Sequence, residues 1–186
     1  MIRVSFICTA NRARSPFAAA LLRRERTPFP VFVDSFGTLD REGSPALPQA
    51  IRAAREFEVD LGDHRARSAT TGRLEQSDLV IGFEHFHVAH AVVMGGAPRS
   101  RVFLLSELAR TLVGLMATTP GDDADFRDAV GRADAARSAA GWRPPAIADP
   151  VGGSDRRFVE TYEEIERMVA VVAVRLFGAD ERALRP

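Results

Sequence analysis

Short apolar runs alternate along the chain with longer segments in which apolar residues recur at helical spacing. The short runs are rich in β-branched and aromatic residues, which favour strands. They predict four strands, at residues 2–8, 29–37, 77–83 and from residue 101 onwards. The longest periodic segment, residues 156–178, carries apolar residues every three or four positions and ends at Gly178, which indicates an amphipathic helix with a glycine cap.

Helices are predicted between these strands, at residues 15–26, 45–57, 84–93 and from about Ser106 onwards. At the first of them, Ser15 is expected to be the N-cap and Pro16 the first helical residue. Strands that alternate with helices predict an α/β fold, a three-layer sandwich in which a four-stranded parallel sheet has helices on both faces. Such sheets bind ligands at the carboxyl ends of their strands, so the turn after residue 8 is the first candidate site.

Residues 117–146 do not follow this alternation. The segment is acidic at first, then rich in alanine and arginine, and it ends in a Pro-Pro pair followed by alanine. This composition predicts a surface helix bounded by loops, inserted into a compact fold. The length of 186 residues fits a single domain covering residues 1–186.

The composition excludes several classes of protein. Apolar residues make up 46% of the chain, and 25 arginines balance 25 acidic residues, with no lysine. A net charge of zero gives no general attraction to nucleic acid, and no apolar run approaches the roughly 20 residues of a membrane span. The first residues lack the length and cleavage pattern of a signal peptide. The lone cysteine, Cys8, excludes an internal disulfide and predicts a reducing, cytoplasmic location.

The stretch CTANRARSP, residues 8–16, carries the strongest chemical signal. The residues between Cys8 and Arg14 can wrap as a loop whose amide N–H groups point inward, and such a nest at a helix N-terminus binds phosphate. Arg14 adds a bidentate clamp, and the same positive field favours the thiolate form of Cys8, so the stretch predicts covalent phosphoryl transfer. The residues expected to contact the phosphate or the rest of the substrate are Thr9, Ala10, Asn11, Arg12, Ala13 and Ser15.

This stretch resembles the loop of the low-molecular-weight protein tyrosine phosphatases, which reads Cys-x-x-Asn-x-x-Arg-Ser-Pro. Members of that family also carry an Asp-Pro pair before the last helix, and Asp149-Pro150 stands at the corresponding place. VDSFGT at residues 33–38 and DHRAR at residues 63–67 are similar to two further family segments. The resemblance spans nearly the whole chain apart from residues 117–146, and it implies the phosphotyrosine protein phosphatase I-like fold.

The resemblance implies a metal-independent phosphomonoester hydrolase, with a protein-tyrosine phosphatase as the leading interpretation and no cofactor. Cys8 would attack phosphorus and form a cysteinyl-phosphate, while Arg14 and the loop amides hold the phosphoryl oxygens. Asp149 would protonate the leaving oxygen and then help to activate water. Because Asp149 must start protonated, activity should peak on the acidic side of neutral.

The resemblance also implies residues that support this chemistry. Ser15 would donate a hydrogen bond to the thiolate, while Ser35 and His64 would hold Asn11 and keep the strained loop in place. Many relatives protect the nucleophile with a second cysteine in the loop. That position is Ala13 here, so the nucleophile would be open to irreversible oxidation.

Departures from the family pattern leave the substrate open. Val151 stands where an aromatic residue usually stacks on the phosphotyrosine ring, and residues 39–46 lack the tryptophan of many relatives. Trp142 and Phe36 are candidate replacements for that wall. Arg12 occupies a position that contacts the leaving group, so it would either favour an acidic peptide or point to solvent.

Other activities remain open beside protein-tyrosine phosphatase. Arsenate reductases share this fold and loop, and a version that passes the adduct to a small thiol needs one cysteine, although Asp149-Pro150 and Ser15-Pro16 favour the phosphatase. Protein-arginine phosphatases carry DPFGGS, which resembles DPVGGS at residues 149–154, but they have threonine at the position of Arg12. A non-catalytic phosphate-binding module would need a broken nucleophile or acid, and neither is broken.

The expected partner is a phosphoprotein, with a tyrosine kinase of a surface-polysaccharide system as a candidate from the bacterial relatives. Neither a nucleic-acid partner nor membrane insertion is expected. His85, His87 and His90 lie close together in EHFHVAH, but only His87 and His90 share a helical face. The cluster therefore predicts a solvated helix face rather than a metal site.

Overall fold

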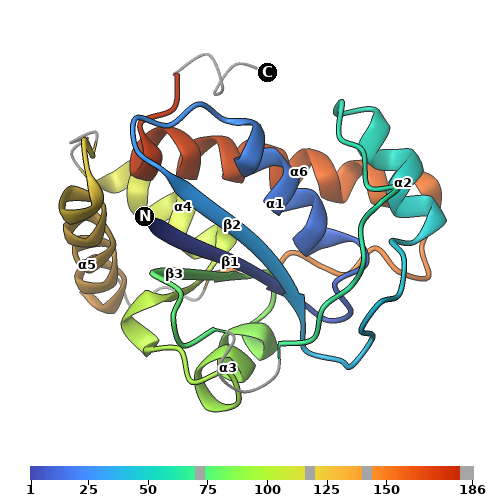
Figure 1. Ribbon diagram of the computed structural model, residues 1–186, viewed down its shortest axis with the longest axis horizontal. Coiled ribbons are helices and arrows are strands. Elements are labelled where there is room, and N and C mark those ends of the chain that lie inside the picture. The colour runs from blue at the N-terminus through green and yellow to red at the C-terminus, as the bar shows by residue number, and fades with distance from the viewer. Residues whose placement is uncertain (70–73, 116–119, 140–143, 181–186) are drawn as a thin grey trace.

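The computed structural model describes residues 1–69, 74–115, 120–139 and 144–180, and these ranges form one parallel sheet with helices around it (Figure 1). The sheet has the order β2-β1-β3-β4, and every neighbouring pair is parallel. Its strands are β1 (Ile2–Cys8), β2 (Val31–Gly37), β3 (Leu79–Gly82) and β4 (Val102–Leu104). The central strand β1 is buried on both faces, which explains its nearly continuous apolar sequence. The predicted four-stranded parallel sheet is therefore confirmed.

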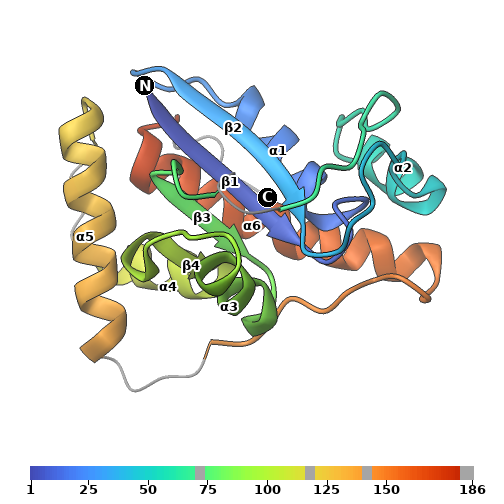
Figure 2. The same cartoon turned by 60° about the horizontal axis from the view of Figure 1, so that its bottom comes forward.

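Helices cover both faces of this sheet. On one face, Phe6 and Ile81 share a core cluster with residues of α1, α4 and α6, and on the other face Val80 packs with Ala91 of α3. Figures 1 and 2 show α3 on the opposite side of the sheet from α1 and α6. The predicted three-layer α/β sandwich is confirmed. The helical elements are α1 (Arg14–Arg24), α2 (Pro48–Arg55), α3 (His85–Val93), the short 3-10 turn η1 (Arg99–Arg101), α4 (Leu105–Gly114), α5 (Asp123–Ala139) and α6 (Asp155–Phe177).

Helix α6 supports the loop that follows β1. The helix is capped at both ends, because Ser154 accepts a hydrogen bond from the first turn and Gly178 adopts a left-handed φ of 64°. Within its apolar stripe, the ring of Tyr162 stacks on Phe17 with a centroid distance of 3.8 Å. The hydroxyl of Tyr162 donates to the carbonyl of Ala13 at 3.2 Å. A core side chain thus holds the end of the loop in place.

The start of α1 differs from the prediction. The helix begins at Arg14 with Ala13 as its N-cap, so Ser15 is not the N-cap and Pro16 is the third helical residue. The buried hydroxyl of Ser15 faces the sulfur of Cys8 rather than the amides of the first turn. Pro16 is tolerated at the third position because the first N–H groups of a helix have no acceptor within the helix.

The predicted helix within residues 117–146 is present as α5, but one side of it belongs to the core. Phe126 and Ala133 are fully buried and join the cluster that covers the sheet. The expectation of a surface helix therefore describes only its outer side. The proposal that this segment is an insertion into a single domain stays a prediction.

Arg137 anchors the end of α5 to the edge of the sheet. Its side chain is only 6% exposed and forms ion pairs with Asp134 at 2.5 Å and Glu107 at 3.5 Å. The guanidinium also donates to the carbonyl of Val102 at 2.6 Å and lies 3.9 Å from the ring centroid of Phe103. Removing a buried cation from its partners costs several kcal/mol of stability, because the partners stay desolvated without it.

We predict that Arg137→Ala lowers the free energy of unfolding by about 3 kcal/mol, because it removes a nearly buried cation that contacts Glu107, Asp134 and the carbonyl of Val102. Arg127→Ala on the same helix is the matched control. Arg127 pairs with Asp78 but is 53% exposed, and such pairs contribute less than about 1 kcal/mol. Urea unfolding measures both changes, and equal losses would contradict an anchoring role for Arg137.

Candidate active site

A cleft of about 250 Å³ opens at the carboxyl end of β1, where the topology predicts a ligand site. The loop after β1 forms its floor, and the residues of that loop in contact with the cleft are Cys8, Thr9, Ala10, Arg12, Ala13 and Arg14. Asp149 reaches the same cleft from the segment before α6. Asn11 and Ser15, which were expected to contact the substrate, are fully buried and do not line the cleft. Their side chains support the loop from within.

The loop presents backbone donors that the protein leaves open. The N–H groups of residues 10–15 have no acceptor among the described residues. Gly37, at the end of β2, lies directly against the loop, since a Cβ there would be 2.8 Å from the carbonyl carbon of Ala10 and 2.9 Å from the nitrogen of Asn11. Open amides at the start of a helix form an anion-binding arrangement.

Asn11 holds the shape of this loop. It adopts a left-handed φ of 54°, which costs a non-glycine residue energy. Its amide group donates to Ser15 Oγ and Ser35 Oγ, each at 2.9 Å, and accepts from the N–H of Arg67 at 2.8 Å. Burial lowers the pKa of His64, and its Nε2–H donates to the carbonyl of Asn11 at 2.7 Å. The structure thus brings Ser35 and His64 to the loop residue that they were expected to support.

Cys8 is a free thiol, 3% exposed, at the base of the cleft. Its sulfur lies 3.0 Å from Ser15 Oγ, and the Ser15 hydroxyl also lies 3.3 Å from the carbonyl of Phe36. The single hydroxyl proton can therefore be donated either to the sulfur or to that carbonyl. Because a thiolate accepts hydrogen bonds and cannot donate one, Ser15 is placed to turn its proton toward an anionic sulfur.

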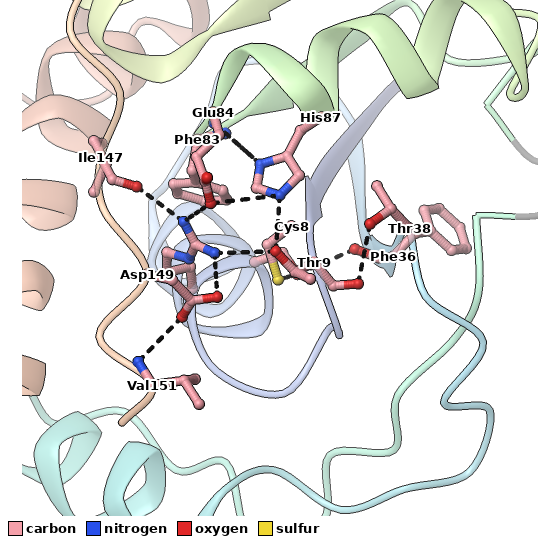
Figure 3. A network of polar contacts seen from close by, with 12 residues as sticks. Cys8, Thr9, Phe36, Thr38, Phe83, Glu84, His87, Ile147, Asp149 and Val151 are labelled. Atoms are coloured by element: carbon pink, nitrogen blue, oxygen red, sulfur yellow. Dashed lines mark hydrogen bonds and ion pairs between the residues drawn. The ribbon is translucent and has the colours of Figure 1, made fainter. Parts of the chain in front are cut away.

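The guanidinium of Arg14 is 1% exposed and occupies the inner end of the cleft. Nη1 donates to Glu84 Oε1 at 2.6 Å and to the carbonyl of Ile147 at 2.9 Å (Figure 3). Nη2 donates to Asp149 Oδ2 at 2.6 Å and to Thr9 Oγ1 at 3.3 Å. The Nε–H of Arg14 has no acceptor among the described residues. It therefore remains, with the loop amides, as a donor for a bound anion.

The segment that carries Asp149 is clipped to the sheet through Ile147. The N–H of Ile147 donates to the carbonyl of Phe83 at 2.8 Å, its carbonyl accepts from Arg14, and its side chain is 1% exposed. Two residues later, the half-buried carboxylate of Asp149 accepts from Arg14 through Oδ2 and from the N–H of Val151 through Oδ1 at 3.2 Å. The clip fixes where this carboxylate stands relative to the loop.

Two residues of the site, Glu84 and His87 at the start of α3, are not predicted from the sequence. The expectation that His87 lies on a solvated helix face is wrong, because its side chain is 1% exposed and its Nε2 lies 3.1 Å from Thr9 Oγ1. Both residues follow β3, the strand beside β1, and that position was the available signal. Among the described residues, no three His, Cys, Asp or Glu side chains form a group that could hold a metal ion.

The upper walls of the cleft are aliphatic. Leu39, Leu47 and Val151 form them, and Val151 is 57% exposed. The expectation that Phe36 lines the cleft is wrong, because this ring is buried in the core cluster on the α3 face of the sheet. Trp142, the other candidate wall, lies outside the described residues. No aromatic side chain of the described residues lines the cleft.

Arg12 and Arg41 place positive charge at the mouth of the cleft. Arg12 is fixed, because its Nε donates to the carbonyl of Pro45 at 2.7 Å and its own carbonyl accepts from the N–H of Leu47 at 3.0 Å. Neither guanidinium pairs with a carboxylate among the described residues. The mouth of the cleft can therefore attract anionic groups.

Comparisons with known proteins agree with this geometry. Residues 3–127 match the model of the low molecular weight phosphotyrosine protein phosphatase family, and the chain belongs to this family. It is therefore a phosphatase, as the resemblance in the sequence predicts. No helix of the described residues is long and apolar enough to cross a membrane.

Its relatives include phosphatases of two named specificities. The chain is 27% identical over 175 residues to the protein-arginine-phosphatase of Bacillus subtilis, covering 93% of this chain and 95% of the relative. It is 32% identical over 98 residues to the low molecular weight protein-tyrosine-phosphatase Wzb of Escherichia coli, covering 53% and 65%. Among solved structures, the arginine phosphatase YwlE of Geobacillus stearothermophilus superposes with a TM-score of 0.70 at 24% identity, covering 95% of this chain and 93% of that one.

We predict that stability falls as the pH is lowered from 6.5. Burial, followed by the charge of Arg14, lowers the pKa of His87 to about 3, so the native state stays neutral where the unfolded state takes up a proton. His87 alone should then cost about 1.5 kcal/mol between pH 6.5 and pH 5.

Urea unfolding at the two pH values measures this loss. His87→Asn removes the titrating group, so the variant should lose less stability over the same interval. Equal pH dependence in the two proteins would show that His87 is not held in its neutral form.

Proposed function

We propose that this phosphatase hydrolyses phosphotyrosine in proteins through a cysteinyl-phosphate intermediate. The observation that carries the proposal is the convergence of Cys8, Arg14 and Asp149 on one cleft whose floor is a loop of open amides. A nucleophile, a fixed cation and a proton donor are the parts that this reaction requires.

The first step follows from the positions of these groups. The sulfur of Cys8 attacks phosphorus, the S–P bond forms, and the bond from phosphorus to the tyrosine oxygen breaks. The N–H groups of residues 10–15 and the Nε–H of Arg14 donate hydrogen bonds to the phosphoryl oxygens and stabilise the negative charge on them. Protonated Asp149 gives its proton to the leaving oxygen, while Ser15 directs its hydroxyl proton to the sulfur.

The second step reverses these roles. The carboxylate of Asp149 takes a proton from water, the water oxygen attacks phosphorus, and the S–P bond breaks. Inorganic phosphate leaves and Cys8 returns as a thiolate that Ser15 stabilises. Arg14 must release Asp149 from its contact at 2.6 Å before the first step, so that the carboxyl group can carry a proton, and the bound phosphoryl group provides the competing anion.

The walls favour a neutral ring as the leaving group. Leu39, Leu47 and Val151 offer apolar contact to a phenol ring. The cations of Arg12 and Arg41 repel a cationic side chain and attract acidic residues that flank the phosphorylated one. The substrate proposed is therefore a phosphotyrosine protein with acidic neighbours, and a bacterial tyrosine kinase is a candidate. The free thiol supports a reducing, cytoplasmic location.

Phosphoarginine is the second candidate substrate. The similarity to the protein-arginine-phosphatase of Bacillus subtilis extends over 93% of this chain. Among the described residues, Asp149 is the single carboxylate that lines the cleft, so it would have to serve the guanidino group both as acid and as hydrogen-bond acceptor.

We predict that Cys8→Ser abolishes hydrolysis of para-nitrophenyl phosphate, because a neutral hydroxyl replaces the thiolate.

Asp149→Asn should cost about 10²- to 10³-fold in kcat with a phosphotyrosine peptide and much less with para-nitrophenyl phosphate, whose leaving group needs little protonation. Steady-state kinetics measure both. Equal losses of kcat on the two substrates would show that Asp149 is not the acid. A wild-type protein that does not hydrolyse phosphate esters but reduces arsenate with a small thiol would overturn the proposal.

We further predict that phosphotyrosine peptides exceed phosphoarginine peptides of matched sequence at least tenfold in kcat/KM. Among the tyrosine peptides, those with acidic neighbours should exceed those with basic neighbours, and added salt should reduce the difference because it screens exposed charges. Phosphate release measures each peptide. A preference for phosphoarginine would make the second candidate the function.

A further inference from the structure

His87 lies next to the proposed chemistry but does not touch the cleft. Its side chain is 1% exposed and is absent from the cleft lining. The approach of α3 to the sheet is close here, since a Cβ on Gly82 would lie 2.9 Å from the Cβ of His87. A buried imidazole therefore lies just behind Thr9, and the absence of a side chain on Gly82 makes room for it.

The backbone around His87 fixes which ring nitrogen carries the proton. Nδ1 accepts from the N–H of Glu84 at 3.0 Å and from the N–H of Phe83 at 3.3 Å. A nitrogen that accepts hydrogen bonds has no proton, so the proton of the neutral ring is on Nε2. Nε2 lies 3.1 Å from Thr9 Oγ1 and 3.8 Å from Glu84 Oε1. Only the Thr9 oxygen is within hydrogen-bond distance, so it receives this proton.

The direction of the Thr9 hydroxyl follows from this assignment. Thr9 Oγ1 also accepts from Arg14 Nη2 at 3.3 Å, so both lone pairs of the hydroxyl oxygen are occupied. The hydroxyl proton has no acceptor among the described residues, and Thr9 lines the cleft floor. Figure 3 shows Thr9 between His87 and Cys8.

We propose that His87 is a positioning residue for the phosphatase reaction, which holds the Thr9 hydroxyl so that its proton is donated to a phosphoryl oxygen in the cleft. This inference rests on the proposed function. His87 acts through Thr9 alone and exchanges no proton with the substrate. Thr9 then adds a side-chain donor to the loop amides and to Arg14.

The charges around His87 keep this arrangement constant over the pH range of catalysis. Burial and the cation of Arg14 lower the pKa of His87 to about 3, and His90 acts in the same direction. Asp149 opposes them, and the carboxylate of Glu84 also faces the ring. Burial and the cation of Arg14 prevail, so the imidazole stays neutral and adds no second positive charge near the phosphate.

His87 also caps α3, because its Nδ1 accepts from the N–H of Glu84, the N-cap residue. Two substitutions separate the positioning role from this capping. In His87→Asn, the side-chain oxygen stands near the place of Nδ1 and can accept from the backbone, but no donor reaches Thr9. In His87→Gln, the amide nitrogen stands near the place of Nε2 and can donate to Thr9, while the backbone acceptor is lost. The pair therefore exchanges one function of the imidazole for the other.

We expect His87→Asn to weaken binding of inorganic phosphate and to lower kcat/KM for para-nitrophenyl phosphate about tenfold, the effect of one hydrogen bond. His87→Gln should stay within about threefold of wild type in both, although its urea midpoint should fall below that of His87→Asn. The opposite ranking, with activity following stability, would show that His87 only caps the helix.

A double-mutant cycle with Thr9→Val tests the connection. If His87 acts through Thr9, His87→Asn should have almost no further effect on phosphate affinity in a Thr9→Val background. Losses that multiply would overturn the proposal. Phosphate affinity reports on His87 even if no phosphatase activity is found. A failure of the proposed function can therefore be distinguished from a failure of the role given to His87.

Nitrogen NMR of the wild-type histidines needs no variant to fold. The His87 signals should show the Nε2–H tautomer and stay unchanged from pH 5 to pH 8. An Nδ1–H tautomer, or titration near the usual value for histidine, would overturn the proposal.

Discussion

The buried guanidinium of Arg14 is the charge around which the functional half of the molecule is organised. A cation at 1% exposure is tolerated only when its hydrogen bonds and its charge are satisfied. Its partners come from three distant parts of the chain: Thr9 after β1, Glu84 after β3, and Ile147 with Asp149 before α6. Satisfying one cation therefore brings the loop after β1, the end of β3 and the candidate acid to a common point.

The loop itself depends on a second constraint, the left-handed backbone of Asn11. A φ of 54° costs about 1–2 kcal/mol for a non-glycine residue, and the hydrogen bonds that Asn11 donates to Ser35 and accepts from His64 and Arg67 offset that cost. Because all of these bonds are made by the protein's own groups, the fold itself holds the open amides in place. Little reorganisation is then left for the reaction, which is the condition under which fixed dipoles lower a barrier most.

Much of the fold and the site could be predicted because the signals are local. The apolar run of β1 and the spacing of Cys8 and Arg14 are complete within 16 residues, and the family motif extended the prediction to Asp149. The predicted helix start was wrong because the hydroxyl of Ser15 contacts the sulfur of Cys8 instead of capping the first turn. His87 is one of three closely spaced histidines that were interpreted as a solvated helix face, and tertiary contact with Thr9 and the room beside Gly82 bury it. Pairing of this kind has no periodicity that a sequence reveals.

The clip at Ile147 sets the position of Asp149 at a point two residues before it, after the chain has returned from α5. The N–H of Ile147 is bonded to the carbonyl of Phe83, and its carbonyl accepts from the guanidinium of Arg14, so these two bonds hold the segment that carries Asp149. The clip therefore divides two duties within one stretch of chain: Phe126 and Arg137 of α5 hold the fold together, while Ile147 sets where the acid stands.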